Sequence, residues 1–152
     1  MADRFRITLA LPDLAATARL GAAIAARLRA GDAILLKGDL GSGKTTLARA
    51  ILTALGVTEN VPSPTFTLVQ AYETPHLTVS HYDLYRLKRD SELDELGLEE
   101  ALEQGAALIE WPERAESRMP GNALIAALST DKERKAVLEG PARWKNLEEI
   151  HV

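Results

Sequence analysis

Residues 38–45 have the types and the spacing that are needed to bind phosphate groups. Their sequence, Gly-Asp-Leu-Gly-Ser-Gly-Lys-Thr, is a complete match to the pattern G-x-x-x-x-G-K-[ST]. The glycines let backbone N–H groups converge on an anion, and the following helix presents its positive N-terminus to it. Lys44 would reach the β- and γ-phosphates, and the Thr45 hydroxyl would bind Mg²⁺. The motif therefore predicts a site for a nucleoside triphosphate.

Two acidic residues each end an apolar segment downstream of this loop. Asp83 follows residues 77–82, and Glu110 follows residues 106–109. A phosphate-loop site needs a carboxylate at the end of a neighbouring strand, to hold the metal or to polarise the attacking water. The sequence alone does not divide these tasks between Asp83 and Glu110. For each, the alternative interpretation is an exposed acid that ends a strand.

Three residues near these acids have more than one interpretation. Trp111 either packs beside the nucleotide, faces a partner or belongs to an apolar core. His81 precedes Asp83 by two residues, so strand alternation places both on one face, where His81 either orients the site or is structural. Thr65, in the proline-stiffened segment 63–66, either senses the γ-phosphate or forms a rigid entry to a strand.

The segments around these residues alternate between strand and helix patterns. The expected strands are 5–9, 33–36, 65–72, 77–82 and 106–109, with 122–128 and 134–139 as an antiparallel pair. The expected helices are 12–30, 44–55, 91–102 (interrupted near Gly97) and 142–150. The first should bury an apolar stripe of Leu14, Ala18, Gly21, Ala25 and Leu28. This order, with the phosphate loop, predicts an α/β, P-loop NTPase-like three-layer sandwich whose sheet is mostly parallel, with some antiparallel strands.

Composition favours a single domain over residues 1–152. A hydrophobic fraction of 46% and a charged fraction of 26% exclude a disordered chain, and the lack of cysteine excludes disulfides and thiolate metal sites. Residues 1–58 carry a net charge of +4 and residues 59–152 a net charge of −8, without a dense basic stripe, so strong direct nucleic-acid binding is not expected. No apolar run could span a membrane or serve as a signal peptide, so we expect a cytoplasmic protein.

An acidic run covers residues 90–103, with seven acids and no base. Such a run is usually a solvated helix face, and the alternative is a surface that docks a partner. Residues 94–97 formally match the D-x-x-G pattern of GTPases, but they lie within a helix pattern. Because the chain also lacks N-K-x-D, we expect no guanine-specific site.

Several segments together resemble one family, the bacterial TsaE (YjeE) ATPases. The resemblance rests on residues 38–46, on S-P-T-F-T-L-V at 63–69, on H-Y-D-L-Y-R-L at 81–87, on E-L-D-E-L-G at 92–97 and on I-E-W-P at 109–112. The phosphate loop alone fits many families, whereas the other motifs in combination are specific. The match runs through residues 38–112, with a similar segment at 12–21, and is weak beyond residue 120.

The resemblance implies a Mg²⁺-dependent ATPase, slow by itself, in the biosynthesis of threonylcarbamoyladenosine, a modified nucleoside beside the tRNA anticodon. It implies that the protein acts on the TsaB–TsaD complex, with ATP at the junction and hydrolysis supporting multiple turnover. It favours Glu110 as the second Mg²⁺ ligand beside Thr45, and Asp83 as a catalytic acid near the γ-phosphate, together with Lys44. The residues expected at the nucleotide are Thr17, Asp39, Leu40, Gly41, Ser42, Gly43, Lys44, Thr45, Thr46, Thr65, Trp111 and Arg134.

Two other functions are compatible with a phosphate loop. A small metabolite kinase would need an arginine-rich lid over the transferred phosphate. Between residues 86 and 118 the chain has only Arg86, Arg89, Arg114 and Arg118, scattered among many acids. A nucleotide-gated binding module would differ from the ATPase only in having negligible hydrolysis.

Overall fold

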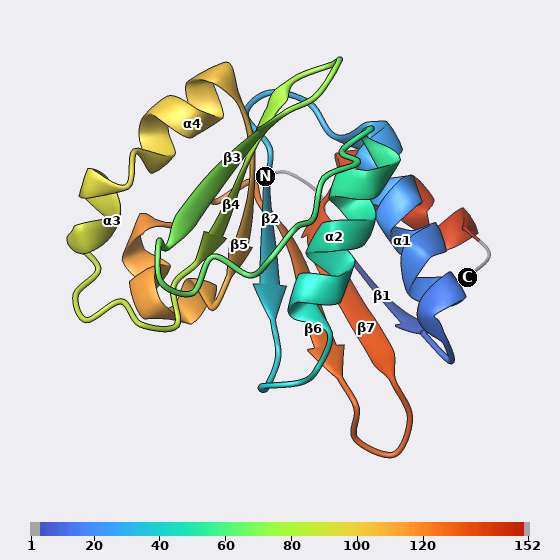
Figure 1. Ribbon diagram of the computed structural model, residues 1–152. Coiled ribbons are helices and arrows are strands. Elements are labelled where there is room, and N and C mark those ends of the chain that lie inside the picture. Colours follow the sequence, from blue (N-terminus) through green and yellow to red (C-terminus); the bar gives the residue numbers. More distant parts are fainter. Residues whose placement is uncertain (1–3, 151–152) are drawn as a thin grey trace.

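The computed structural model describes residues 4–150, which form one seven-stranded sheet with helices on both faces (Figure 1). The strands are β1 (Arg4–Ala10), β2 (Ala33–Lys37), β3 (Val69–Glu73), β4 (Thr78–Asp83), β5 (Gly105–Glu110), β6 (Leu124–Ser129) and β7 (Lys135–Pro141). The helices are α1 (Leu14–Arg27), α2 (Lys44–Ala54), α3 (Glu92–Glu95) and α4 (Leu98–Gln104), with two 3₁₀ segments, η1 (Pro112–Arg118) and η2 (Ala142–Glu149).

The sheet is mixed, with a parallel centre. Its strand order is β1-β7-β6-β2-β5-β4-β3. The pairings β6–β2, β2–β5 and β5–β4 are parallel, and the outer pairings are antiparallel. Only β3 and β7 run against the common direction among the described strands. This arrangement confirms the predicted α/β class with a mostly parallel sheet and some antiparallel strands.

Alternate residues of the central strand β2 face two separate cores. Ile34 and Leu36 pack into the core formed with α1, α2 and η2, whereas Ala33 and Leu35 pack into the core beneath α3, α4 and η1. Burial on both faces explains the short uninterrupted apolar run, since a central parallel strand has no solvent-facing side. In Figure 1, α1 and α2 lie side by side in front of the sheet.

Helix α1 has a different buried face from the one predicted. Its N-cap is Asp13, whose Oδ1 accepts a hydrogen bond from the Ala16 N–H at 2.8 Å. Leu14 and Ala18, which were expected in the buried stripe, are exposed. A Cβ on Gly21 would lie 2.5 Å from the Ala50 Cβ, so this glycine is what lets α1 approach α2 closely. The buried residues are Ala16, Thr17, Leu20, Gly21, Ile24 and Ala25.

Two other expectations need correction. The strand expected at 65–72 begins only at Val69, because residues 65–68 form a turn in which Leu68 is left-handed (φ 68°) and its N–H donates to the Pro64 carbonyl. The C-terminal helix exists over Ala142–Glu149, but as a 3₁₀ segment. The interruption expected near Gly97 is confirmed, since Gly97 has φ 69° and separates α3 from α4.

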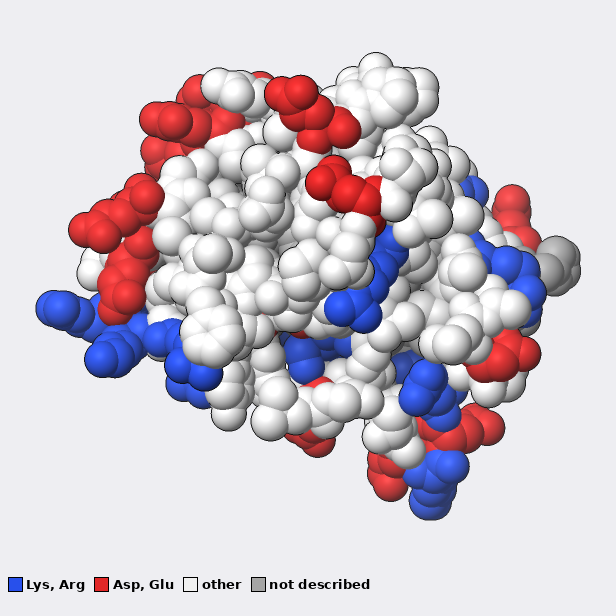
Figure 2. Space-filling view, in the orientation of Figure 1, with Lys and Arg blue, Asp and Glu red and all other residues white. Residues whose placement is uncertain are grey.

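The acidic run covers the outer surface of α3 and α4. Leu93 and Leu98 face the core, while Asp94, Glu95 and Glu99 are exposed. Figure 2 shows acidic side chains gathered over these helices at the upper left, with Lys and Arg side chains below them. The acidic side chains are thus exposed on one helical surface, as both a solvated face and a surface that docks a partner would require. Among residues 4–150, no helix has the length and apolar character that crossing a membrane requires.

Candidate functional site

The phosphate loop joins the end of β2 to the start of α2. Gly38 (φ 141°) has no room for a side chain, since a Cβ would lie 2.5 Å from the Leu128 carbonyl oxygen. Gly41 (φ 81°) and Gly43 (φ 105°) are also left-handed, but nothing lies within 4 Å of the position that a Cβ would take. Side chains at these two positions would project into open space over the loop. The glycines therefore leave the backbone accessible at the N-terminus of α2, as an anion site requires.

Lys44 is buried at the base of the loop. Its Nζ donates to the carbonyl oxygens of Gly38 (2.6 Å) and Asp39 (2.9 Å) and lies 4.3 Å from the centre of the Trp111 ring. Burial lowers the pKa of Lys44, and the negative charge of Glu110, first among the nearby carboxylates, opposes that shift. The ammonium group is therefore poorly hydrated and directed at the phosphate loop.

Glu110, at the end of β5, is bound at both carboxylate oxygens. Its Oε1 accepts a hydrogen bond from the Thr45 hydroxyl at 2.8 Å. Its Oε2 lies 2.6 Å from Nε2 of His81 on the neighbouring strand β4. Glu110 is 2% exposed and His81 is 0% exposed. A carboxylate and a hydroxyl of the phosphate loop thus lie together, and they are the pair that the family resemblance favours as Mg²⁺ ligands.

Asp83, at the end of β4, is paired in register with Glu110 on β5. Its Oδ2 accepts hydrogen bonds from the hydroxyls of Ser63 (2.7 Å) and Thr65 (3.3 Å). Its Oδ1 accepts from the backbone N–H of Tyr85 at 3.0 Å. Thr65 thus lies in the turn that leads into β3 and contacts the acid, and its role at the γ-phosphate stays a prediction.

A cleft of about 310 Å³ collects most of the predicted nucleotide residues. Ser63 also lines it, although no role was predicted for it, and its position two residues before Thr65 was the available signal. Of the predicted residues, Thr17 is buried within α1, and Asp39 and Ser42 line a separate cavity beside the β6–β7 turn. The cleft is lined by Leu40, Gly41, Gly43, Lys44, Thr45, Thr46, Ser63, Thr65, Asp83, Glu110, Trp111 and Arg134.

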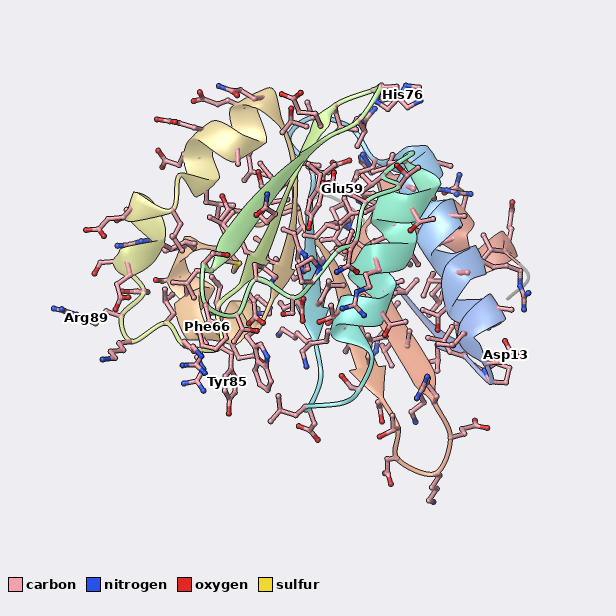
Figure 3. The ribbon with its side chains drawn as sticks, in the orientation of Figure 1. Asp13, Glu59, Phe66, His76, Tyr85 and Arg89 are labelled. Carbon is pink, nitrogen blue, oxygen red and sulfur yellow. The ribbon has the colours of Figure 1, made fainter. Side chains whose placement is uncertain are left out.

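Aromatic side chains border this cleft. Trp111 is left-handed (φ 60°) and half-buried, and its ring lies 4.9 Å from that of Tyr85. It covers Lys44 on one side and packs against the core beneath α3 and α4 on the other. Phe66 is 84% exposed, and the Arg86 guanidinium lies over its ring, 4.6 Å from the ring centre. Figure 3 shows Phe66 and Tyr85 projecting from the same lower edge of the molecule.

The residues of the cleft fit a Mg²⁺–nucleotide complex. Within residues 4–150, no group of three or more Asp, Glu or His is arranged to hold a metal ion without help. Mg²⁺ in phosphate-transfer sites is characteristically held by one or two protein oxygens, substrate phosphates and water. The Thr45 hydroxyl and the Glu110 carboxylate provide such oxygens beside an open anion loop. The donor set therefore suits a metal that arrives with its nucleotide.

Comparisons with known proteins identify the family. The model of the family described as "Threonylcarbamoyl adenosine biosynthesis protein TsaE" matches residues 11–137. The chain is 48% identical over 105 residues to the tRNA threonylcarbamoyladenosine biosynthesis protein TsaE of Rickettsia bellii (68% of this chain, 73% of that protein). It is 40% identical over 123 residues to the protein of the same name from Bacillus subtilis (79% and 75%). For other Rickettsia relatives the match spans 56–62% of their length.

The fold leads to the same family. The crystal structure of YdiB from Bacillus subtilis superposes with a TM-score of 0.71 at 31% identity, covering 98% of this chain and 94% of that chain. A family match over residues 11–137 includes the phosphate loop, both acidic strand ends and Arg134. The chain belongs to the TsaE family, with the P-loop NTPase-like fold and the nucleotide-binding loop of that family.

Proposed function

We propose that the protein is a Mg²⁺-dependent ATPase subunit that serves threonylcarbamoyladenosine modification of tRNA in the cytoplasm, acting on the TsaB–TsaD complex. Hydrolysis would support repeated turnover of that complex, and the isolated chain would hydrolyse ATP slowly. The relatives named for tRNA threonylcarbamoyladenosine biosynthesis support the pathway. The observation that carries the ATPase assignment is the hydrogen bond between Thr45 and Glu110 at the mouth of the phosphate loop.

Each residue of the cleft has a distinct task in this proposal. Lys44 and the backbone of the loop bind the β- and γ-phosphates, and Thr45 with Glu110 holds Mg²⁺, which neutralises charge on the phosphates. Asp83 lies beside Glu110 in the sheet register and orients the attacking water. Three hydrogen-bond donors, the hydroxyls of Ser63 and Thr65 and the backbone N–H of Tyr85, hold the Asp83 carboxylate in place for this task.

The border of the cleft supports action on a protein partner. Leu40 is 71% exposed, Phe66 is 84% exposed and Tyr85 is 38% exposed. Exposed apolar side chains beside a nucleotide cleft suit a contact that depends on the bound nucleotide. The net charge of −4 and the acidic face of α3 and α4 argue against direct, tight binding of tRNA.

A capture experiment tests the proposed function. The full chain is used as bait in lysate of its own cells, with Mg²⁺ and a non-hydrolysable ATP analogue or with EDTA, and captured proteins are identified by mass spectrometry. We expect TsaB and TsaD with the nucleotide and much less without it. Recovery of neither protein, together with brisk ATP hydrolysis by the isolated chain, would contradict the proposal.

Lys44→Ala tests whether the capture of partners depends on nucleotide binding by this chain. Removing this charge-assisted contact should cost about 1.5–3 kcal/mol, a decrease in ATP affinity of roughly 10- to 100-fold by calorimetry. The nucleotide-dependent capture of partners should disappear with it. Lys37→Ala is the control, since Lys37 ends β2 but lies outside the cleft. Wild-type ATP affinity in Lys44→Ala would show that the phosphate-loop assignment is wrong.

A metabolite kinase is the alternative, and the cleft does not favour it. A kinase clamps the transferred phosphate with several arginines. Among the described residues that line the cleft, Arg134 is the one arginine. Arg86 and Arg114 lie instead over the rings of Phe66 and Tyr85, and Arg118 pairs with Asp94.

A further inference from the structure

We infer that His81 is a positioning residue, which fixes the Glu110 carboxylate so that one of its oxygens is presented to Mg²⁺. This inference rests on the proposed function, because it concerns the metal that accompanies ATP. The family comparisons give no role to His81.

The two oxygens of Glu110 have opposite surroundings. Oε1 faces the phosphate loop and accepts from the Thr45 hydroxyl at 2.8 Å. Oε2 faces the protein interior and lies 2.6 Å from Nε2 of His81, which is 0% exposed. A carboxylate oxygen only accepts hydrogen bonds, so Nε2 is the donor. His81 therefore occupies the inner oxygen and leaves the outer oxygen for the loop and its ligands.

Within the described part of the chain, Glu110 is the one hydrogen-bond partner of the His81 ring. Its buried Nδ1 has no hydrogen-bond partner among residues 4–150. An imidazole kept only for packing would carry two buried polar nitrogens, at a cost that an apolar side chain of similar volume avoids. Glu110 is the one group that repays part of this cost. The buried histidine is thus explained by what it does to the carboxylate.

The contact also joins two rigid elements. His81 lies on β4 and Glu110 on β5, and these strands are parallel neighbours in which Asp83 pairs with Glu110 and His81 with Leu108. A ligand held by a neighbouring strand keeps its orientation better than one that is held by a loop. Groups that orient metal ligands in this way change metal affinity or activity by about 10- to 100-fold when they are removed.

The test compares metal requirement with metal-free nucleotide affinity. In His81→Leu, the Mg²⁺ concentration for half-maximal tightening of fluorescent ADP binding should rise about 10- to 100-fold. ADP affinity in EDTA should stay within about twofold of wild type. Mn²⁺ binding to the ADP complex, followed by electron paramagnetic resonance, should weaken by a similar factor. An unchanged metal requirement in the folded variant, or an equal loss of ADP affinity in EDTA, would overturn the inference.

Two further variants separate positioning from packing. His81→Gln has an amide N–H at about the reach of Nε2 and should restore most of the metal affinity. In His81→Asn the amide is one carbon shorter and should not. If His81→Leu fails to fold, His81→Gln and His81→Asn still test the positioning role. Equal metal requirements in these two variants would overturn the inference. Tyr82→Phe is the control for a buried polar change on the same strand, since the Tyr82 hydroxyl contacts Leu96 instead of the cleft.

Measurements on the wild-type protein separate a failure of the proposed ATPase function from a failure of the proposed role of His81. If Mg²⁺ does not tighten nucleotide binding to wild type at all, the proposed ATPase function is wrong. If Mg²⁺ tightens binding equally in wild type and in folded His81→Leu, only the role of His81 is wrong.

Discussion

The two carboxylates of the cleft are attached to different parts of the molecule. The Glu110 carboxylate is held by a buried histidine on β4 and by a hydroxyl at the start of α2, so both of its side-chain partners lie in regular secondary structure. Asp83 is held by the hydroxyls of Ser63 and Thr65, which lie between α2 and β3, where no helix or strand is present. The acids are neighbours in the sheet, but one has a rigid environment and the other depends on a loop.

This difference suggests a division of labour. A metal ligand must keep its geometry from one catalytic cycle to the next, and the environment of Glu110 suits that task. A group that acts on the attacking water can be assembled when nucleotide or partner arrives, and segments of low local stability are where such assembly occurs. The loop hydroxyls would then make Asp83 the adjustable half of the site. Variants of the two acids and of their partners should therefore differ in which property they change.

Glu110→Gln should have the largest effect. The amide keeps the shape but loses the charge that binds Mg²⁺, a contribution of several kcal/mol, so ATP turnover should fall about 1000-fold or more. The Mg²⁺ requirement for nucleotide binding should rise as well. Steady-state turnover and a Mg²⁺ titration of nucleotide binding measure both. Glu116→Gln, on the exposed surface of η1, is the control. If Glu110→Gln needed no more Mg²⁺ than wild type, a group other than Glu110 would bind the metal.

Asp83→Asn should reduce turnover by about 100-fold, which is the lower end of what a positioned acid or base contributes. In contrast to Glu110→Gln, the Mg²⁺ requirement for nucleotide binding should stay within about threefold of wild type. The same two assays apply, with the exposed Asp94→Asn as control. An equal rise in metal requirement in both acid variants would show that Asp83 and Glu110 share the metal.

Ser63→Ala combined with Thr65→Val should have a smaller effect on turnover, because the Asp83 carboxylate itself and its hydrogen bond from the Tyr85 N–H are retained. A decrease of roughly 3- to 10-fold per bond is expected. Hydrogen exchange should accelerate over residues 62–68 and stay unchanged around Glu110. Thr67→Val, an exposed threonine of the same loop, is the matched control. Faster exchange around Glu110 would show that the two carboxylates share one environment.

The local features of this site were predictable from sequence, and the pairings were not. The phosphate loop and the acids after apolar runs are short-range patterns, so the motif and the strand ends located Lys44, Thr45, Asp83 and Glu110. Which of the acids meets Thr45 depends on the order of β2, β5 and β4 in the sheet, and no local pattern encodes that order. The partner of His81 was undetermined for the same reason.

The errors have physical causes as well. In an alanine-rich helix such as α1, hydrophobicity differs little around the helix, and close packing at Gly21 decides which face is buried. In the loop, alternating side chains indicated a strand, whereas Leu68 takes a left-handed conformation that non-glycine residues rarely adopt. That turn is what brings Thr65 to Asp83. The turn that was mistaken for a strand is therefore also the reason why the contact between Thr65 and Asp83 was not predicted.

The smallest expected effect on activity belongs to Tyr82→Phe, which tests whether perturbing β4 by itself disturbs the cleft. Tyr82 lies between His81 and Asp83, but its ring packs in the core beneath α3 and α4, and its hydroxyl donates to the Leu96 carbonyl at 3.1 Å. Turnover and Mg²⁺ requirement should stay within about twofold of wild type, while the free energy of unfolding at pH 8 decreases by about 1 kcal/mol. A larger loss of turnover would mean that disturbing β4 is enough to damage the site, and the variants of His81 and Asp83 would then say little about their own side chains.

The same variant has a predictable dependence on pH. Burial raises the pKa of Tyr82 to about 12 from its usual value of 10.0. Between these two values the unfolded chain loses the phenolic proton while the folded chain keeps it, so this residue lowers wild-type stability as the pH rises. The other tyrosines are common to both proteins and cancel in the difference. Urea unfolding at pH 8 and pH 11 should therefore show the advantage of wild type over Tyr82→Phe shrinking by about 1.4 kcal/mol per pH unit above 10. If the stability difference between wild type and Tyr82→Phe stayed constant, Tyr82 would ionise as readily in the folded protein as in the unfolded chain. Its hydroxyl would then be in contact with solvent, and not buried away from the cleft.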